Sequence, residues 1–330
     1  MNKLSDRLNR LSYSQTFVMS NKARDMKAAG IDVISLTLGE PDFDVPDNIK
    51  KAAFDAINEN YSHYSPVPGF LELRKAIVNK LKRDNNLDYK PTQICVANGA
   101  KQNIFNVLAA LVNEGDEVIL PAPYWVSYDE MVKINGGVSV FIETNIDTEF
   151  KMTAEQLEAA ITPKTKAVLY SSPCNPSGSY YTREELEKIA NVMAKYPDVV
   201  IISDEIYEFI NYDGEHVSIA EFPQVFNQTA VINGMSKAFA MTGWRIGYSA
   251  CPEWLADACD KLQGQVTSGA NTVAQRASIV GLETDPKDYY YMVESFEKRR
   301  NLVYELLKEV PGFKVNLPKA AFYFFPDISY

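Results

Sequence analysis

The stretch that decides the fold runs from Lys166 to Asp204 and reads KAVLYSSPCNPSGSYYTREELEKIANVMAKYPDVVIISD. It opens and closes with short apolar runs, at 166–170 and 199–203, and a helical pattern at 182–195 lies between them. Thr182 and Glu185 have the spacing of a capping box, which marks the start of that helix. Two apolar strands joined by one helix predict a βαβ unit with parallel strands. Their continuous apolar character predicts burial on both faces of the sheet.

The same alternation extends in both directions along the chain. Further strands are expected at 93–97, 117–121, 138–142 and 230–233, and further helices at 100–112, 124–134 and 153–161. The sequence therefore predicts an α/β fold with a mixed, mostly parallel sheet covered by helices on both faces.

The pattern changes near residue 286, where one long charged helix is expected at about 286–309, followed by strands at 312–316 and 321–325. We expect three parts: an N-terminal segment 1–46 that joins a small domain, a large domain 47–285, and a small α/β C-terminal domain 286–330. Because the last expected strand lies five residues before the end of the printed sequence, we expect the small domain to continue beyond residue 330.

Composition narrows the class of protein. The 330 residues are 46% hydrophobic and 23% charged, which is typical of a globular chain. A net charge of −10 disfavours general nucleic-acid binding. Four scattered cysteines predict a reduced, cytoplasmic protein, and two histidines cannot form a His-rich metal site. No apolar run approaches the roughly 18 residues of a membrane span, so no membrane partner is expected.

Polar and aromatic residues follow the predicted strands, at the edge where open parallel sheets bind ligands. These residues are Asn98-Gly-Ala-Lys101, Pro123-Tyr-Trp125, Ser172-Pro-Cys-Asn-Pro-Ser-Gly178, Asp204-Glu-Ile-Tyr207 and Gly234-Met-Ser-Lys237. The dinucleotide, P-loop and nucleophile-elbow motifs are absent. A lysine in a pocket can form a Schiff base with an aldehyde, and an acid beside a ring nitrogen suits a pyridinium electron sink. Each of these residues alone has an ordinary structural explanation. The prediction of a functional site rests on all of them falling at one edge of the sheet.

These residues resemble the signatures of class-I pyridoxal-phosphate-dependent aminotransferases, in particular the bacterial aspartate subgroup. The matching segments are 38–43 (LGEPDF), 64–69 (YSPVPG), 123–128 (PYWVSY), 175–178 (NPSG), 203–207 (SDEIY) and 234–247 (GMSKAFAMTGWRIG). They cover nearly the whole chain in the family's order. The resemblance implies the fold-type-I architecture of pyridoxal-phosphate (PLP) enzymes, with PLP as cofactor, a homodimer, and amino acids and 2-oxo acids as substrates.

The resemblance implies a role for each matched residue around the cofactor ring. Lys237 would form the Schiff base with the cofactor and then move the proton between substrate and cofactor. Asp204 would hold the pyridine nitrogen protonated. Asn175 and Tyr207 would hydrogen-bond the 3′ oxygen, and Trp125 would stack on the ring face.

The resemblance also implies a phosphate site at the start of the helix after Gly99. The amides of Ala100 and Lys101 would bind the phosphate there, where the helix dipole favours anions. Arg245 would add a bidentate charged contact. Tyr64 would reach the phosphate from the partner subunit of the homodimer.

Two departures from the family pattern stand out. Gly234 occupies a position where many relatives have a phosphate-binding serine, and Ser236 is the expected substitute. The family's C-terminal arginine, which clamps the substrate α-carboxylate, falls beyond the printed sequence. Gly39, Trp125 and Asn175 are the expected substrate contacts within it.

The resemblance implies an aminotransferase that moves an amino group from an L-amino acid, most favourably aspartate, to 2-oxoglutarate. The motifs leave the preferred side chain open, including aromatic amino acids. A β-eliminating lyase on the same scaffold is the nearest alternative, because both reactions begin by removing the same α-proton. A non-catalytic effector-binding domain is a second alternative, disfavoured by the acidic chain.

Overall fold

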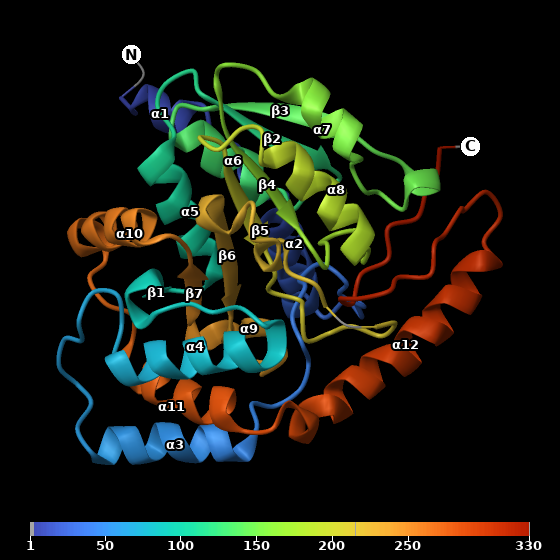
Figure 1. Cartoon of the computed structure of the whole chain (residues 1–330). Coiled ribbons are helices and arrows are strands. Elements are labelled where there is room, and N and C mark those ends of the chain that lie inside the picture. The colour runs from blue at the N-terminus through green and yellow to red at the C-terminus, as the bar shows by residue number, and fades with distance from the viewer. Residues whose placement is uncertain (1–2, 215, 330) are drawn as a thin grey trace.

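The computed structural model describes residues 3–214 and 216–329. A seven-stranded sheet in the order β1-β7-β6-β5-β4-β2-β3 forms its centre (Figure 1). Strand β7 pairs antiparallel with β1 and β6, and the other neighbours pair in parallel. The strands are β1 Ile94–Ala97, β2 Glu117–Ala122, β3 Val138–Glu143, β4 Thr165–Ser171, β5 Val200–Asp204, β6 Thr229–Gly234 and β7 Gly247–Ala250.

The predicted mixed, mostly parallel sheet is confirmed, and six of its strands lie where the apolar runs place them. The sequence pattern missed β7, because this strand has only four residues, begins with a glycine and pairs antiparallel with both neighbours, so it is not part of a βαβ unit. The sheet register brings three strand ends together. Ser171 of β4 lies beside Asp204 of β5, which lies beside Ile232 of β6. The loops that leave these ends therefore start from one edge.

Twelve α-helices of the described chain surround this sheet (Figure 1). They are α1 Asp6–Asn9, α2 Gln15–Ala28, α3 Asp47–Asn58, α4 Leu71–Asn85, α5 Ala100–Leu111, α6 Ser127–Ile134, α7 Ala154–Ala160, α8 Arg183–Met193, α9 Met235–Ala238, α10 Glu253–Val266, α11 Thr272–Glu283 and α12 Tyr290–Lys308. A capping box opens α8 at Thr182, as predicted, and another opens α7 at Thr153. The helix expected at 124–134 begins only at Ser127, because 123–126 form the loop after β2.

Alternating residues of each strand pack into different layers, as the pleat requires. Ile202 of β5 packs in one apolar cluster with Ile104 of α5, whereas Ile201 packs in another with Ile189 of α8. On β1, Cys95 joins the α5 cluster and Val96 joins a third cluster built from α3, α4 and α11. Helices α5, α6 and α10 therefore cover one face of the sheet, and the other helices of the clusters cover the opposite face.

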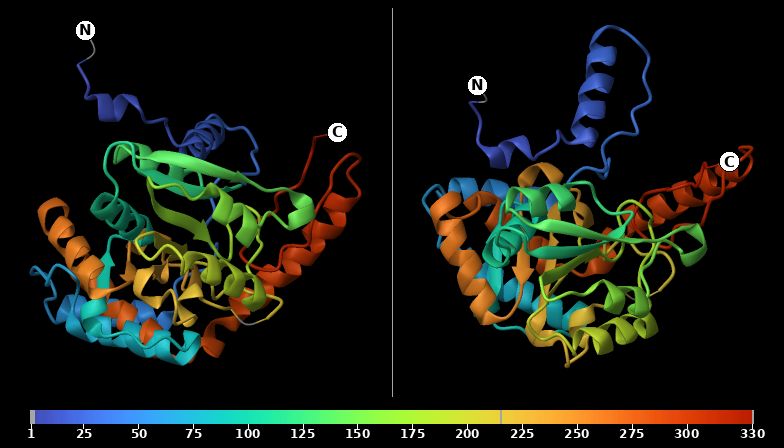
Figure 2. Two further views of the ribbon diagram at one scale, coloured as in Figure 1. Left: turned by 45° about the horizontal axis from the view of Figure 1, so that its top comes forward. Right: turned by 90° about the horizontal axis from the view of Figure 1, so that it is seen from above.

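The chain ends depart from the sheet (Figure 2). Helices α1 and α2 form an arm that stands away from the body, and α12 runs along the opposite side. Phe43, in the segment that follows the arm, packs edge-on against Phe296 of α12 at a ring-centroid distance of 5.2 Å. Among the helices described, none is both long enough and apolar enough to cross a membrane.

The expected strands at 312–316 and 321–325 are wrong. In the described residues this region makes only single bridges, Asn211 with Ala320 and Lys314 with Asp327. The apolar pattern at 321–325 comes from side chains that pack individually, since Phe322 and Tyr323 contact the ring of Tyr207. The division into domains at residues 46 and 285 stays a prediction.

Candidate active site

Loops from the carboxyl ends of the strands bring together most of the residues singled out in the sequence. Lys237 lies on the short helix α9, directly after β6, and its Nζ donates a 2.5 Å hydrogen bond to the carbonyl of Gly39. Its Nζ also lies 5.7 Å from the ring centre of Tyr207. Burial, assisted by the charge of Arg245 and opposed by the attraction of Glu40 and Asp204, lowers the pKa of Lys237 to about 8. A nearly buried lysine with this pKa is partly neutral near pH 7 and can act as a nucleophile or base.

Asp204 is the last residue of β5, and its carboxylate is buried. Burial raises the pKa of Asp204 to about 6, against two hydrogen bonds that favour the charged form. The hydroxyl of Tyr128 donates to Oδ2 at 2.6 Å, and the backbone N–H of Ile206 donates to Oδ1 at 3.2 Å. A buried carboxylate with a raised pKa is suited to face a cationic partner.

The start of α5 forms a cradle of backbone. Gly99 caps this helix with φ of 85°, in the left-handed region that favours glycine. A Cβ at Gly99 would collide with the guanidinium of Arg245, and a Cβ at Gly247 would collide with the backbone of Ala100. Arg245 itself donates to the carbonyls of Thr242 and Asn98, at 2.8 and 3.2 Å. A helix N-terminus beside an arginine is an anion-binding arrangement.

Asn175 and Tyr207 converge on a third side chain, that of Tyr323. Asn175 donates to the Tyr323 hydroxyl at 3.3 Å, and the hydroxyls of Tyr207 and Tyr323 share a hydrogen bond. A Cβ at Gly39 would also meet the Tyr323 ring. The loop after β4, the turn after β5 and the C-terminal segment thus meet at one point.

Trp125 and Lys101 lie beside each other. The Lys101 Nζ is 4.9 Å from the ring centre of Trp125, within the range of a cation–π contact. Burial and the nearby charge of Arg245 lower the pKa of Lys101. Ser236 is buried next to Lys237 on α9. Tyr64 is 95% exposed, and within the described chain no contact joins it to the other predicted residues.

Sequence reasoning missed Tyr128 and Tyr323 as parts of this site. Tyr128 lies three residues after Trp125, so its proximity could have been inferred from helical spacing. Nothing in the sequence indicated Tyr323, which reaches Tyr207 across 116 residues.

Residues 31–330 match the family profile described as Aminotransferase class I and II. The chain belongs to this family of enzymes, which depend on pyridoxal 5′-phosphate and transfer amino groups between amino acids and 2-oxo acids.

Individual relatives agree with this assignment. The chain is 48% identical over 98% of its length to a probable aspartate/prephenate aminotransferase of Rhizobium leguminosarum bv. phaseoli, of which it covers 82%. It is 48% identical over 99% of its length to an aspartate aminotransferase of Bacillus sp. (strain YM-2), of which it covers 83%. Among solved structures, the aspartate aminotransferase of Thermus thermophilus with maleate has a TM-score of 0.95 and 40% identity, with coverage of 99% of this chain and 85% of that one.

Proposed function

We propose that this enzyme transfers the amino group of L-aspartate to 2-oxoglutarate. The observation that carries the proposal is the convergence of a partly buried lysine, a buried aspartate and an arginine-flanked helix N-terminus at the carboxyl edge of the sheet. Support for aspartate comes from the names of the relatives and from maleate, a dicarboxylate, in the Thermus thermophilus structure.

The residues present fit both the phosphate group and the pyridine ring of PLP, which form the two ends of the cofactor. At one end, Arg245 and the backbone of Gly99, Ala100 and Lys101 offer donors suited to a phosphate. Arg245 is already oriented there by its bonds to two backbone carbonyls. We assign Ser236, buried on the adjacent helix α9, as a further phosphate contact.

At the other end, Asp204 is a buried carboxylate whose raised pKa falls again when a protonated ring nitrogen lies beside it. We assign Asn175 and Tyr207 to the cofactor's 3′ oxygen, and the face of Trp125 to its ring. Gly39, Trp125 and Asn175 are the proposed substrate contacts.

When bound, PLP supplies an electron sink for the electrons left behind when the α-proton departs. Lys237 would hold the cofactor, and its neutral Nζ would take the proton from the substrate α-carbon and pass it to the cofactor side. The lowered pKa suits this work, because a base near pKa 8 is deprotonated in useful amount near neutral pH. Tyr128 keeps Asp204 charged by donating to it.

Prephenate is a second candidate amino acceptor. The observation that favours it is the name of the Rhizobium relative, an aspartate/prephenate aminotransferase at 48% identity. Replacing 2-oxoglutarate by prephenate in the second half-reaction separates the two acceptors.

We also infer a homodimer. Leu4, Leu8, Phe17 and Met19 expose at least half of their apolar side chains on the N-terminal arm, which stands away from the body (Figure 2). A partner subunit would cover such a surface. We assign the exposed Tyr64 to the partner's phosphate site.

We also propose that segment 1–46 joins the region 286–330 in one small domain, which the packing of Phe43 on Phe296 supports. A cytoplasmic location is a further proposal, supported by the four free cysteines.

A panel of half-reactions tests the proposed substrate. The PLP-loaded enzyme is mixed with single L-amino acids in the absence of a 2-oxo acid, and the cofactor absorbance is followed. Aspartate and glutamate are expected to convert the cofactor fastest. Pyruvate released from L-cysteine without any acceptor would instead support the β-lyase.

A further inference from the structure

The turn that carries Asp204 and Tyr207 is held by a second set of contacts. Residues 204–208 leave β5 as a tight turn in which the Glu208 N–H donates to the Glu205 carbonyl at 2.9 Å. Asp204 and Tyr207 contact the tyrosines of the candidate active site. Glu205 and Glu208 contact a separate group of polar side chains, so the turn has one functional side and one anchored side.

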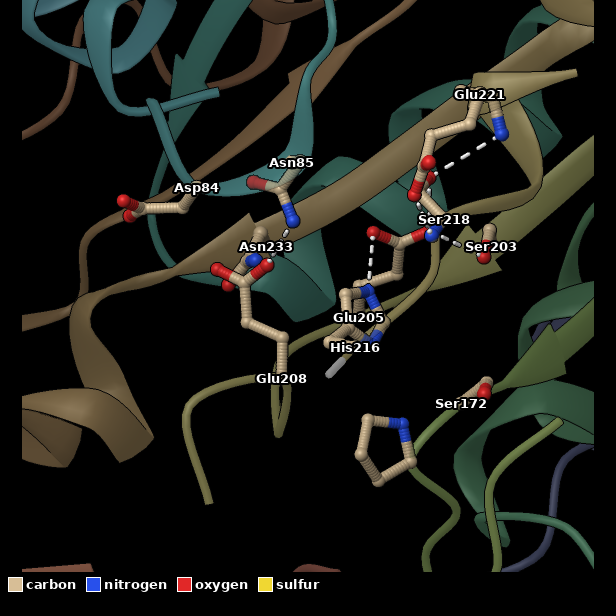
Figure 3. Close-up of polar contacts among 12 residues, drawn as sticks. Asp84, Asn85, Ser172, Ser203, Glu205, Glu208, His216, Ser218, Glu221 and Asn233 are labelled. Carbon is tan, nitrogen blue, oxygen red and sulfur yellow. Dashed lines mark hydrogen bonds and ion pairs between the residues drawn. The ribbon is translucent and has the colours of Figure 1, made fainter. Parts of the chain in front are cut away.

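Glu205 is 1% exposed and uses both carboxylate oxygens (Figure 3). Its Oε1 accepts hydrogen bonds from the hydroxyls of Ser203 at 2.8 Å and Ser218 at 2.7 Å. Its Oε2 lies 3.0 Å from Nε2 of His216. The first anchor therefore joins the turn to β5 and to the loop around residue 217.

Glu208 forms the second anchor, on helix α4. Asn85 donates to its Oε2 at 2.8 Å, as Figure 3 shows, and Lys80 pairs with its Oε1. The Lys80 Nζ also donates to Oδ1 of Asn85 at 2.7 Å. Lys80 is 8% exposed and Asn85 is 4% exposed, so this anchor is shielded from solvent.

Glu205 and Glu208 each face a basic side chain. Ligand atoms of Glu205, Glu208 and His216 all lie within 4.8 Å of one another, close enough to suggest a metal site. The ammonium of Lys80 forms an ion pair with the Glu208 carboxylate, and the His216 imidazole faces the Glu205 carboxylate. Burial would lower the pKa of His216, but its hydrogen bond to and attraction by Glu205 raise it above the ordinary value. Each carboxylate thus already has a basic partner within the protein, Lys80 for Glu208 and His216 for Glu205, and we do not assign the cluster to a metal ion.

We propose that Lys80 and His216, acting through Glu208 and Glu205, are positioning residues that fix Asp204 and Tyr207 against the cofactor. The proposal rests on the proposed roles of those two residues. Anchors on α4 and on the 216–218 loop approach the turn from elements that contribute nothing else to the site. Movement of Asp204 relative to the ring therefore requires breaking a buried ion pair.

Charge-removing variants test this. Lys80→Gln keeps a hydrogen-bond donor but loses the cation, His216→Gln keeps a donor but loses the imidazole, and Lys80→Arg keeps the charge. In PLP-loaded protein, the visible absorbance reports the protonation of the Schiff base between Lys237 and PLP. The pH midpoint of this absorbance change is expected to rise by about half a pH unit or more in both Gln variants. The reason is that Asp204 and Tyr207, once less firmly held, stabilise the deprotonated Schiff base less. The kcat for aspartate is expected to fall about tenfold while KM stays within about twofold. Lys80→Arg is expected to restore both values.

Two controls separate positioning from stability. Ile189→Ala in the buried core of α8 lowers Tm without touching the turn, and Lys195→Gln removes an exposed ion pair, 2.8 Å from Glu158. Both are expected to keep the wild-type absorbance midpoint. Gln variants that lose Tm but keep the wild-type midpoint and kcat would overturn the proposal, as would a rise in Tm of the cofactor-free protein on adding Zn²⁺. If wild-type protein neither binds PLP nor transaminates, the proposed function fails first and the roles of Asp204 and Tyr207 fail with it.

Discussion

The hydroxyl of Tyr128 donates a 2.6 Å hydrogen bond to Oδ2 of Asp204, and both side chains are buried. Tyr128 belongs to α6 and Asp204 ends β5, so the bond joins a helix to the carboxyl end of a strand. Burial raises the pKa of Asp204, and the phenol works against that rise by favouring the carboxylate. The pair therefore sets how much negative charge the site offers to a ring nitrogen.

Tyr128→Phe removes the donor and leaves the buried carboxylate short of one bond. A hydrogen bond to a charged group contributes about 1.5–3 kcal/mol, so kcat is expected to fall roughly 10- to 100-fold. Steady-state kinetics with aspartate measure this. Tyr124→Phe is the matched control, because the Tyr124 ring stacks on Phe141 and its hydroxyl does not bond Asp204. Equal activity of the two variants would show that the hydrogen bond from Tyr128 to Asp204 does not contribute to catalysis.

Asp204→Asn is expected to stabilise the cofactor-free protein while disabling it. The folded-state pKa of Asp204, about 6, lies above its ordinary 3.8, so the folded state binds more protons than the unfolded state between these values. Stability of the wild type therefore falls as pH rises from about 4 to 6, by at most about 3 kcal/mol. The variant lacks this loss. Denaturant unfolding at pH 4 and pH 7.5 checks it: the variant should gain only at the higher pH, and turnover should still fall steeply.

The lowered pKa of Lys237 predicts how cofactor-free protein captures PLP. Only the neutral amine attacks an aldehyde, so the rate should rise as pH increases and level off above about 8, the pKa that burial imposes. Stopped-flow absorbance across pH 6–11 measures the midpoint. A midpoint near 10.5, the ordinary value of a lysine, would show that the amine is solvated.

Gly99→Ala is expected to abolish PLP binding or weaken it by more than tenfold, since the new methyl meets Arg245 and occupies the cradle at the start of α5. Gly115→Ala is the matched control. Gly115 has nearly the same φ, +83° against +85°, but nothing lies within 4 Å of its added Cβ. Both variants place an alanine at a positive φ, so a loss of PLP affinity confined to Gly99→Ala reports the cradle. Equal losses would place the phosphate elsewhere.

The sequence predicted the sheet because its central strands are buried on both faces and read as apolar runs, and the partly exposed edge strand β3 is apolar enough to give the same pattern. It also predicted the site edge, because the carboxyl ends of parallel strands converge wherever such a sheet forms. It missed Tyr323 and the Lys80–Glu208 anchor, since periodicity shows which face of an element a residue occupies and not which distant element it meets. The apolar run at 321–325 led to an incorrect strand prediction. Side chains that pack one by one against distant residues give the same apolar pattern as a buried strand.

Borohydride reduction of the PLP-loaded enzyme, followed by peptide mass spectrometry, tests the central claim most directly. The position of Lys237 after β6, its contact with Gly39 and its lowered pKa predict a reduced adduct on the peptide that contains Lys237. Lys101, which is partly buried and also has a lowered pKa, is the internal control for non-specific labelling. An adduct on Lys237 alone is the predicted result, and an adduct on Lys101 or any other lysine in its place would contradict the account.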